Sequence, residues 1–137
     1  MYNYIAVAID GSDNALRATA EAIRLASTTA TIELIYVIDV DHVRQEVLHA
    51  TSPDALMLAR RQKIAPYEAL VQQAHRNVKI TILKGLPGPS IVDYVNTRPV
   101  DIIVIGSRGL NAFQQMVLGS VSHKVMKRAT CPVLVVK

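Results

Sequence analysis

The chain has 137 residues, half of them hydrophobic, and its 15 basic and 11 acidic residues give a formal net charge of +4. This length suits one core, so we expect residues 1–137 to form a single domain. No stretch reaches the roughly 20 apolar residues of a membrane-spanning helix, and we therefore expect a cytoplasmic protein without membrane contact. We expect no nucleic-acid partner, since the chain has no Trp and one Phe for base stacking.

Five short apolar segments rich in Val and Ile predict β-strands. They cover residues 4–9, 31–38, 78–83, 100–105 and 132–136. Longer segments with helical periodicity separate them, and this alternation is typical of βαβ units around a parallel sheet. The fourth segment is apolar on both strand faces, as a strand covered by helices on both sides requires. The sequence therefore predicts a doubly wound α/β fold.

The helical segments follow the strands in chain order. The first helix starts after a turn at residues 10–12 and is expected to end near Ser27. The second follows the apolar positions of residues 56–74, and we expect a kink or break at Pro66, which lacks a backbone N–H. Shorter helices are predicted over residues 90–96 and residues 121–129.

Residues 39–53 carry no clear period. A segment of this length fits either a surface excursion or a flap over a binding site. The sequence leaves both interpretations open.

A glycine motif connects the fourth strand to the last helix. Two residues separate Gly106 from Gly109, and nine more lead to Gly119 and Ser120. Glycines let backbone amides approach a phosphate closely, and the amides of Gly119 and Ser120 would join the positive end of the last helix. The spacing favours a phosphate site. The alternative is that the three glycines serve strand ends, turns and packing without a ligand.

This motif resembles the nucleotide-binding motif of ATP-binding universal stress proteins. Other segments are similar to the same family, namely residues 4–12 to its first strand and acidic turn, 34–39 to its second strand, 85–91 to the turn after its third strand, and 131–136 to its closing strand. The resemblance implies an open, Rossmann-like, five-stranded parallel sheet with strand order 3-2-1-4-5 and helices on both faces. In such sheets ligands bind where the winding reverses, outside the ends of the first and fourth strands.

The resemblance also implies which residues bind ATP. They are Ala8, Asp10, Val37, Ile105, Gly106, Arg108, Gly109, Gly119, Ser120, Val121 and Ser122. Those up to Gly106 would border the adenine and ribose, and the others would surround the phosphates. Magnesium or manganese would be held through the phosphate oxygens, so no metal ligand is expected from the protein.

Three of these positions have a second interpretation or depart from the family. Ala8 stands where related ATP-binding sequences often carry proline. Asp10 suits the cap of a helix as well as a ligand contact. For Val37, a plain core residue is the favoured interpretation.

The resemblance implies a nucleotide-dependent regulator of the stress response. It also implies a homodimer joined through the C-terminal strand, which would otherwise leave an unpaired edge. One alternative is a dimeric stress-response interaction protein that needs no nucleotide. Another is a flavin or dinucleotide carrier, although the fingerprint glycines of such carriers are missing after the first strand.

Catalysis receives little support from the sequence. The segment 119–123 is not the Gly-x-Ser-x-Gly elbow of hydrolases, because His123 replaces the second glycine. The four histidines lack metal-ligand spacing. We expect no catalytic residues and, at most, slow hydrolysis of bound ATP.

Overall fold

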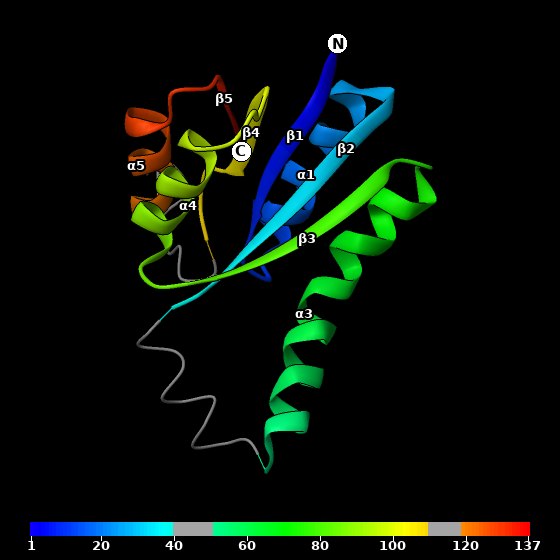
Figure 1. Cartoon of the computed structure of the whole chain (residues 1–137), viewed down its shortest axis with the longest axis vertical. Helices are drawn as coiled ribbons and strands as arrows, with labels where there is room; N and C mark the ends of the chain where they lie inside the picture. Colours follow the sequence, from blue (N-terminus) through cyan, green and yellow to red (C-terminus); the bar gives the residue numbers. More distant parts are fainter. Residues whose placement is uncertain (40–50, 110–118) are drawn as a thin grey trace.

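A computed structural model describes residues 1–39, 51–109 and 119–137, and it shows a twisted sheet with helices on both faces (Figure 1). The elements in chain order are β1 (Tyr2–Ile9), α1 (Asp13–Leu25), β2 (Ala26–Ile38), α3 (Pro53–Gln73), β3 (Asn77–Lys84), α4 (Pro87–Asn96), β4 (Ile102–Gly106), α5 (Ser120–Arg128) and β5 (Val133–Val136). Within the described residues the sheet has five strands in the order β3-β2-β1-β4-β5, and all four pairings are parallel. The expected doubly wound fold and strand order are confirmed.

Two hydrophobic clusters attach the helices to the two faces of the sheet. On one face, α1 and α3 pack against strand residues such as Val7 and Leu34. On the other face, α4 and α5 pack against residues such as Ala6 and Ile35. Neighbouring residues of a strand point to opposite faces, and all of β4 is buried. This explains why the fourth strand segment is apolar throughout.

The observed boundaries differ from the predicted ones at several ends. α1 ends at Leu25 and β2 begins at the next residue, so Ser27, the expected helix end, lies inside the strand. α4 begins three residues earlier than predicted, at Pro87, because proline fits the first turn of a helix. Most of the segment without a clear period lies outside the described residues.

A kink or break was expected at Pro66, and α3 runs through this residue without a break. Proline removes the hydrogen bond to the carbonyl four residues earlier, that of Gln62. Both Gln62 and Pro66 are exposed, so water can bind the released carbonyl. The helix is held instead by its buried face, which carries Ile64, Tyr67 and Val71.

No described helix has the length and apolar composition needed to cross a membrane.

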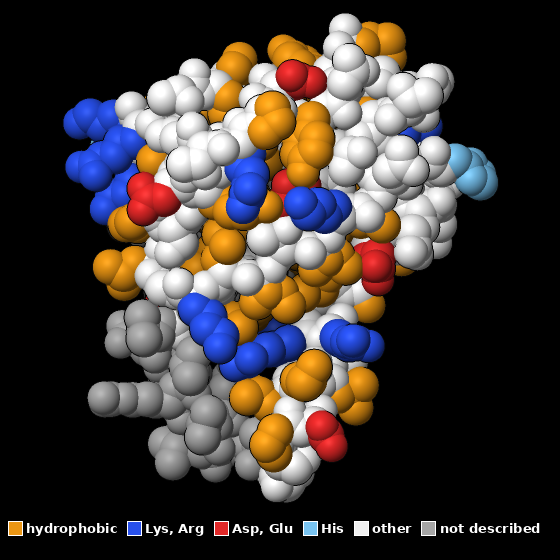
Figure 2. Space-filling model, in the orientation of Figure 1, with side chains coloured by type: hydrophobic (Ala, Val, Ile, Leu, Met, Phe, Trp, Pro, Cys, Tyr) orange, Lys and Arg blue, Asp and Glu red, His pale blue; other side chains and the backbone are white. Residues whose placement is uncertain are grey.

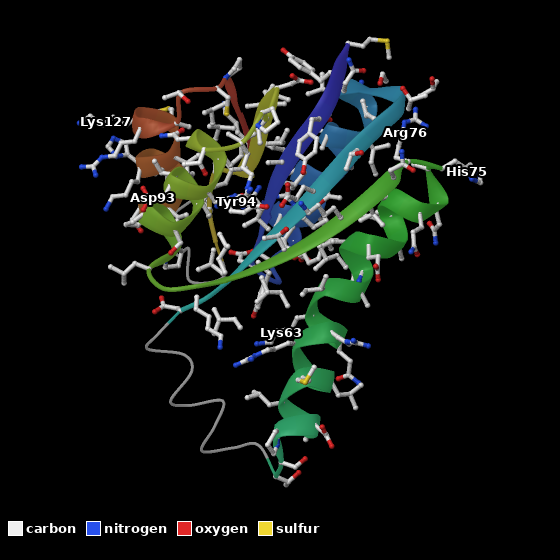
Figure 3. All side chains as sticks on the ribbon, viewed as in Figure 1. Lys63, His75, Arg76, Asp93, Tyr94 and Lys127 are labelled. Carbon is white, nitrogen blue, oxygen red and sulfur yellow. The ribbon has the colours of Figure 1, made fainter. Side chains whose placement is uncertain are left out.

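A buried carboxylate ties three strands and α4 together. Glu33 in β2 is fully buried. The hydroxyl groups of Tyr4 and Thr81 donate hydrogen bonds to it at 2.5 Å, and the Tyr94 hydroxyl is a third donor. Figure 3 shows Tyr94 between α4 and the strands. Burial acts to raise the pKa of Glu33, but the hydrogen bonds from the three hydroxyls outweigh it and hold the pKa below its ordinary value.

We expect Glu33→Gln to lower the free energy of unfolding by about 1–3 kcal/mol near neutral pH, because a neutral amide is a weaker acceptor for three hydroxyls. Since the folded-state pKa of Glu33 is depressed, its stabilisation is complete above the ordinary pKa and is lost as the pH falls through the folded-state pKa. The difference in the free energy of unfolding between parent and variant should therefore become smaller in acid. Urea unfolding at about pH 7 and about pH 3.5 measures it.

Glu21→Gln is the matched control, because Glu21 lies on the surface and forms an ion pair with the exposed Arg24. That substitution should change stability by less than about 0.5 kcal/mol. A Glu33→Gln variant as stable as the parent near neutral pH would show that the buried carboxylate contributes nothing to the fold.

Candidate functional site

A cavity of about 500 Å³ lies at the carboxyl ends of β1, β2 and β4, beside the first turn of α5. β1 and β4 are neighbours in the sheet although their crossovers leave in opposite directions, so the winding reverses at this point. Every residue that the sequence analysis assigned to a ligand lines the cavity. They are Ala8, Asp10, Val37, Ile105, Gly106, Arg108, Gly109, Gly119, Ser120, Val121 and Ser122. The fold therefore brings the acidic turn and the glycine motif together.

The acidic turn after β1 is closed by its own side chains. Asp10 Oδ1 accepts hydrogen bonds from the Ser12 amide at 2.9 Å and the Ser12 hydroxyl at 2.5 Å. The Ser12 hydroxyl accepts in turn from the Ala15 amide and so caps α1. Gly11 between them has a φ of 92°, which favours glycine. Ser12, rather than Asp10, is therefore the helix cap, and Asp10 orients that cap while lining the cavity.

The first two glycines of the motif make room for protein atoms. A Cβ at Gly106 would lie 2.4 Å from Asn14 Oδ1, and a Cβ at Gly109 would lie 2.8 Å from Asp10 Oδ2. Neither glycine has a positive φ. Gly106 therefore allows the end of β4 to pack closely on the start of α1, and Gly109 lies against the Asp10 carboxylate of the acidic turn.

Gly119 holds the other end of the motif at the start of α5. Its amide donates to the Ser107 carbonyl at 2.7 Å, and the Ser122 hydroxyl donates to the same carbonyl at 3.0 Å. Gly119 is the N-cap of α5 and provides no side-chain cap. The first amides of a helix have no partner within the helix, so the amides of Ser120, Val121 and Ser122 present the positive helix end to the cavity.

Eight further residues line the cavity that the sequence analysis did not assign to a ligand. They are Ile9, Ala15, Tyr36, Ile38, Asp39, Lys63, Pro87 and Ile91. Most belong to the ends of β1 and β2 or the starts of α1 and α4, and only the folded structure shows that they lie beside the cavity. Lys63 comes from the middle of α3 (Figure 3). With Arg108 it adds a second basic side chain to a wall that also carries Asp10 and Asp39.

Tyr67 joins α3 to the acidic turn. Its side chain is buried, and its hydroxyl donates a hydrogen bond to the Ser12 carbonyl at 2.9 Å. Burial, followed by the negative charge of Asp10, raises the pKa of Tyr67 to about 12. The hydroxyl therefore stays protonated as a donor over the physiological range. The helical period placed Tyr67 on a buried face, but only the packing of α3 showed this contact.

The described residues contain no group of three or more His, Cys, Asp and Glu side chains that could hold a metal ion. His75 and His123 are exposed. His42 and His49 lie outside the described residues.

Figure 2 shows basic and acidic side chains distributed over one face of the molecule, with hydrophobic side chains at its lower end near the start of α3.

Comparison with known proteins relates the whole chain to one family. The model of the universal stress protein family matches residues 1–137. The universal stress protein YxiE of Bacillus subtilis is 32% identical over an alignment of 155 residues that covers 100% of both chains. The solved structure of MJ0577, a universal stress protein of Methanocaldococcus jannaschii, has a TM-score of 0.86 at 29% identity and covers 100% of this chain and 96% of that one.

A more distant structure shows the same fold with a nucleotide present. The universal stress protein from Archaeoglobus fulgidus in complex with dAMP has a TM-score of 0.71 at 23% identity and covers 99% of this chain and 98% of that one. Because the family match extends over residues 1–137 and YxiE is related over its full length, the chain belongs to the universal stress protein family.

Proposed function

We propose that this protein binds an adenine nucleotide, primarily ATP, in the cavity at the switch point of its sheet. We further propose that it acts in the cytoplasm as a nucleotide-dependent regulator of the stress response. The observation that carries the proposal is the convergence of two distant motifs on one cavity. Family membership and the dAMP complex of the Archaeoglobus fulgidus protein support an adenine nucleotide as the ligand.

The two sides of the cavity suit the two parts of a nucleotide. Ala8, Val37 and Ile105 give an apolar wall for a base, and Asp10 provides a carboxylate that can accept hydrogen bonds from ribose hydroxyls. The uncapped start of α5 suits phosphate groups, because its amides and its dipole both favour an anion. The Gly119 amide and the Ser122 hydroxyl already bind Ser107, so they shape this end of the cavity.

A divalent cation would be held mainly by the nucleotide. Magnesium keeps several waters and binds through one or two carboxylates together with phosphate oxygens. Asp10 and Asp39 are the acidic side chains in the described cavity wall. We therefore propose magnesium or manganese as part of the bound nucleotide complex, and binding rather than turnover as the activity.

We expect Mg-ATP to raise the melting temperature by on the order of 5–10 °C, whereas NAD and FMN leave it unchanged. A ligand at 100 times its dissociation constant that binds only the folded state adds about 2.7 kcal/mol of stability, and a chain of this size converts that into a shift of several degrees. Differential scanning fluorimetry with each ligand at millimolar concentration measures it.

Acid extraction of the purified protein, followed by mass spectrometry, identifies any ligand that was already bound. Equal shifts with FMN would favour the carrier alternative. No shift with ATP and no extracted nucleotide would favour an interaction protein that works without nucleotide.

We also propose that two copies of the chain associate through β5. Within the described sheet, β3 and β5 are the two edge strands. β3 carries Lys79 and Lys84, and charges of this kind protect an edge from pairing. Val133–Val136 has no charge and is only half-buried along its length. A two-fold mate would cover this edge in both copies at once.

A further inference from the structure

The side chain of Asn14, the second residue of α1, lies between two segments from the C-terminal half of the chain. Its Oδ1 accepts a hydrogen bond from the Arg108 amide at 2.8 Å. Its Nδ2 donates to the Val136 carbonyl at 3.1 Å. The same carbonyl accepts from the Ser107 amide at 2.7 Å. One carboxamide therefore joins α1, the segment after β4 and the end of β5.

This arrangement leaves little room for change. Asn14 is 6% exposed, so water cannot readily replace its partners. Its Oδ1 lies so close to the backbone of Gly106 that a Cβ there would be 2.4 Å away. Asn14 lies in the first turn of α1, yet both of its side-chain hydrogen bonds go to residues outside this helix. The residue is therefore explained by its tertiary contacts rather than by α1 itself.

The segment that Asn14 holds leads directly into the cavity. Arg108 and Gly109 line the cavity wall, and the Ser107 carbonyl accepts the hydrogen bonds that place Gly119 and Ser122 at the start of α5. A shift of this segment would therefore move both ends of the glycine motif. The side-chain hydrogen bonds of Asn14 go to Arg108 and Val136, whereas Ala8 and Val37 on the base side belong to β1 and β2.

We propose that Asn14 is a positioning residue for the phosphate-binding end of the cavity. It fixes the backbone at Ser107 and Arg108 through a hydrogen bond to the Arg108 amide, and it anchors this segment to the end of β5 through the Val136 carbonyl. The proposal rests on the proposed binding of an adenine nucleotide. It assigns Asn14 a larger effect on the binding of the phosphates than on the binding of the base.

Calorimetric titration of Asn14→Ala with Mg-ATP and with adenosine tests this role. We expect the affinity for Mg-ATP to fall about tenfold, while the affinity for adenosine changes less than about twofold, because adenosine has no phosphate. A loss of general stability would reduce both affinities together, so the ratio of the two separates positioning from folding. Asn14→Ser, which keeps a small polar side chain, gives the same test if the alanine variant folds poorly.

Asn96→Ala is the matched control. The exposed Asn96 carboxamide also joins a backbone carbonyl to a backbone amide, those of Arg128 and Thr130, but at the carboxyl-terminal end of α5, away from the cavity. The Asn96→Ala variant should leave the ratio of the Mg-ATP affinity to the adenosine affinity unchanged. Hydrogen exchange of the Arg108 amide, followed by NMR without nucleotide, should be faster in the Asn14 variants and unchanged in Asn96→Ala.

The possible failures are distinguishable. A parent protein that does not bind Mg-ATP would refute the proposed function and this role of Asn14 with it. Binding by the parent, with the same ratio of affinities in folded Asn14 variants or an equal loss of adenosine binding, would refute the role of Asn14 alone.

Discussion

Gly119→Asp is expected to abolish measurable Mg-ATP binding while the protein stays folded. Gly119 has a φ of −64° and a ψ of 156°, which any residue can adopt. Aspartate is among the best N-cap residues, and the added charge favours the helix start by about 0.3–1 kcal/mol. A Cβ at this position would lie 3.2 Å from the Ser107 carbonyl and 3.3 Å from the Ser122 hydroxyl, so a displacement of a few tenths of an ångström accommodates it.

The loss of binding has two physical causes. The new carboxylate would accept hydrogen bonds from the same first-turn amides that we assign to the phosphates. The carboxylate would also repel the phosphate groups, since two like charges about 5 Å apart repel each other by about 3 kcal/mol at an effective dielectric constant of about 20. That energy corresponds to a loss in affinity on the order of a hundredfold or more. Calorimetric titration, with circular dichroism to confirm the fold, measures the effect.

Gly119→Asn provides the control, because asparagine has the shape and capping ability of aspartate without its charge. It should weaken Mg-ATP binding far less than aspartate does. The difference between the two variants therefore reports charge repulsion at this helix end. If folded Gly119→Asp bound Mg-ATP as tightly as the parent, the phosphates could not lie at the start of α5 and our site assignment would be wrong.

Val135→Lys is expected to convert a dimer into a monomer. Light scattering of the parent protein should give twice the chain mass of 15.0 kDa, because pairing of β5 with its mate removes an exposed apolar edge. In the variant, each copy would bring one lysine into the proposed β5 interface. Juxtaposed like charges at an interface cost several kcal/mol, so the variant should have the mass of one chain.

Val135→Thr is the control for this experiment. Threonine keeps the branched shape and strand preference of valine without a charge, and this variant should remain dimeric. Since Val135 packs on the cluster that α4 and α5 form, circular dichroism must show that the lysine variant is folded. A parent protein with the mass of a single chain, or a folded lysine variant with the mass of two, would contradict association through β5.

The strands and the position of the cavity could be predicted from the sequence. Continuous apolar segments specify buried parallel strands, because both faces of such strands must be covered. Once the strand order is known, the end of β1 at Asp10 and the end of β4 at Gly106 must meet at the switch point. The residues assigned to a ligand line one cavity for this reason.

Local rules were insufficient where packing competes with them. Pro66 predicted a kink or break, yet α3 continues through it without a break, because its buried face holds the helix and water can reach the released carbonyl of Gln62. Asp10 suited a helix cap as well as a ligand contact. The cap is Ser12, because the Asp10 carboxylate binds the Ser12 hydroxyl and orients it towards the Ala15 amide.

By itself, the sequence determined the fold class, the switch point and the two motifs that meet there. The fold class and the motifs are visible in periodicity and spacing along the chain, whereas the strand order that sets the switch point followed from the resemblance to a known family. Only the tertiary structure decided that Gly106 makes room for Asn14, that Asn14 binds Arg108 and Val136, and that Lys63 reaches the cavity from α3. These contacts join segments that lie far apart in the sequence, and a distance between such segments exists only after the chain has folded.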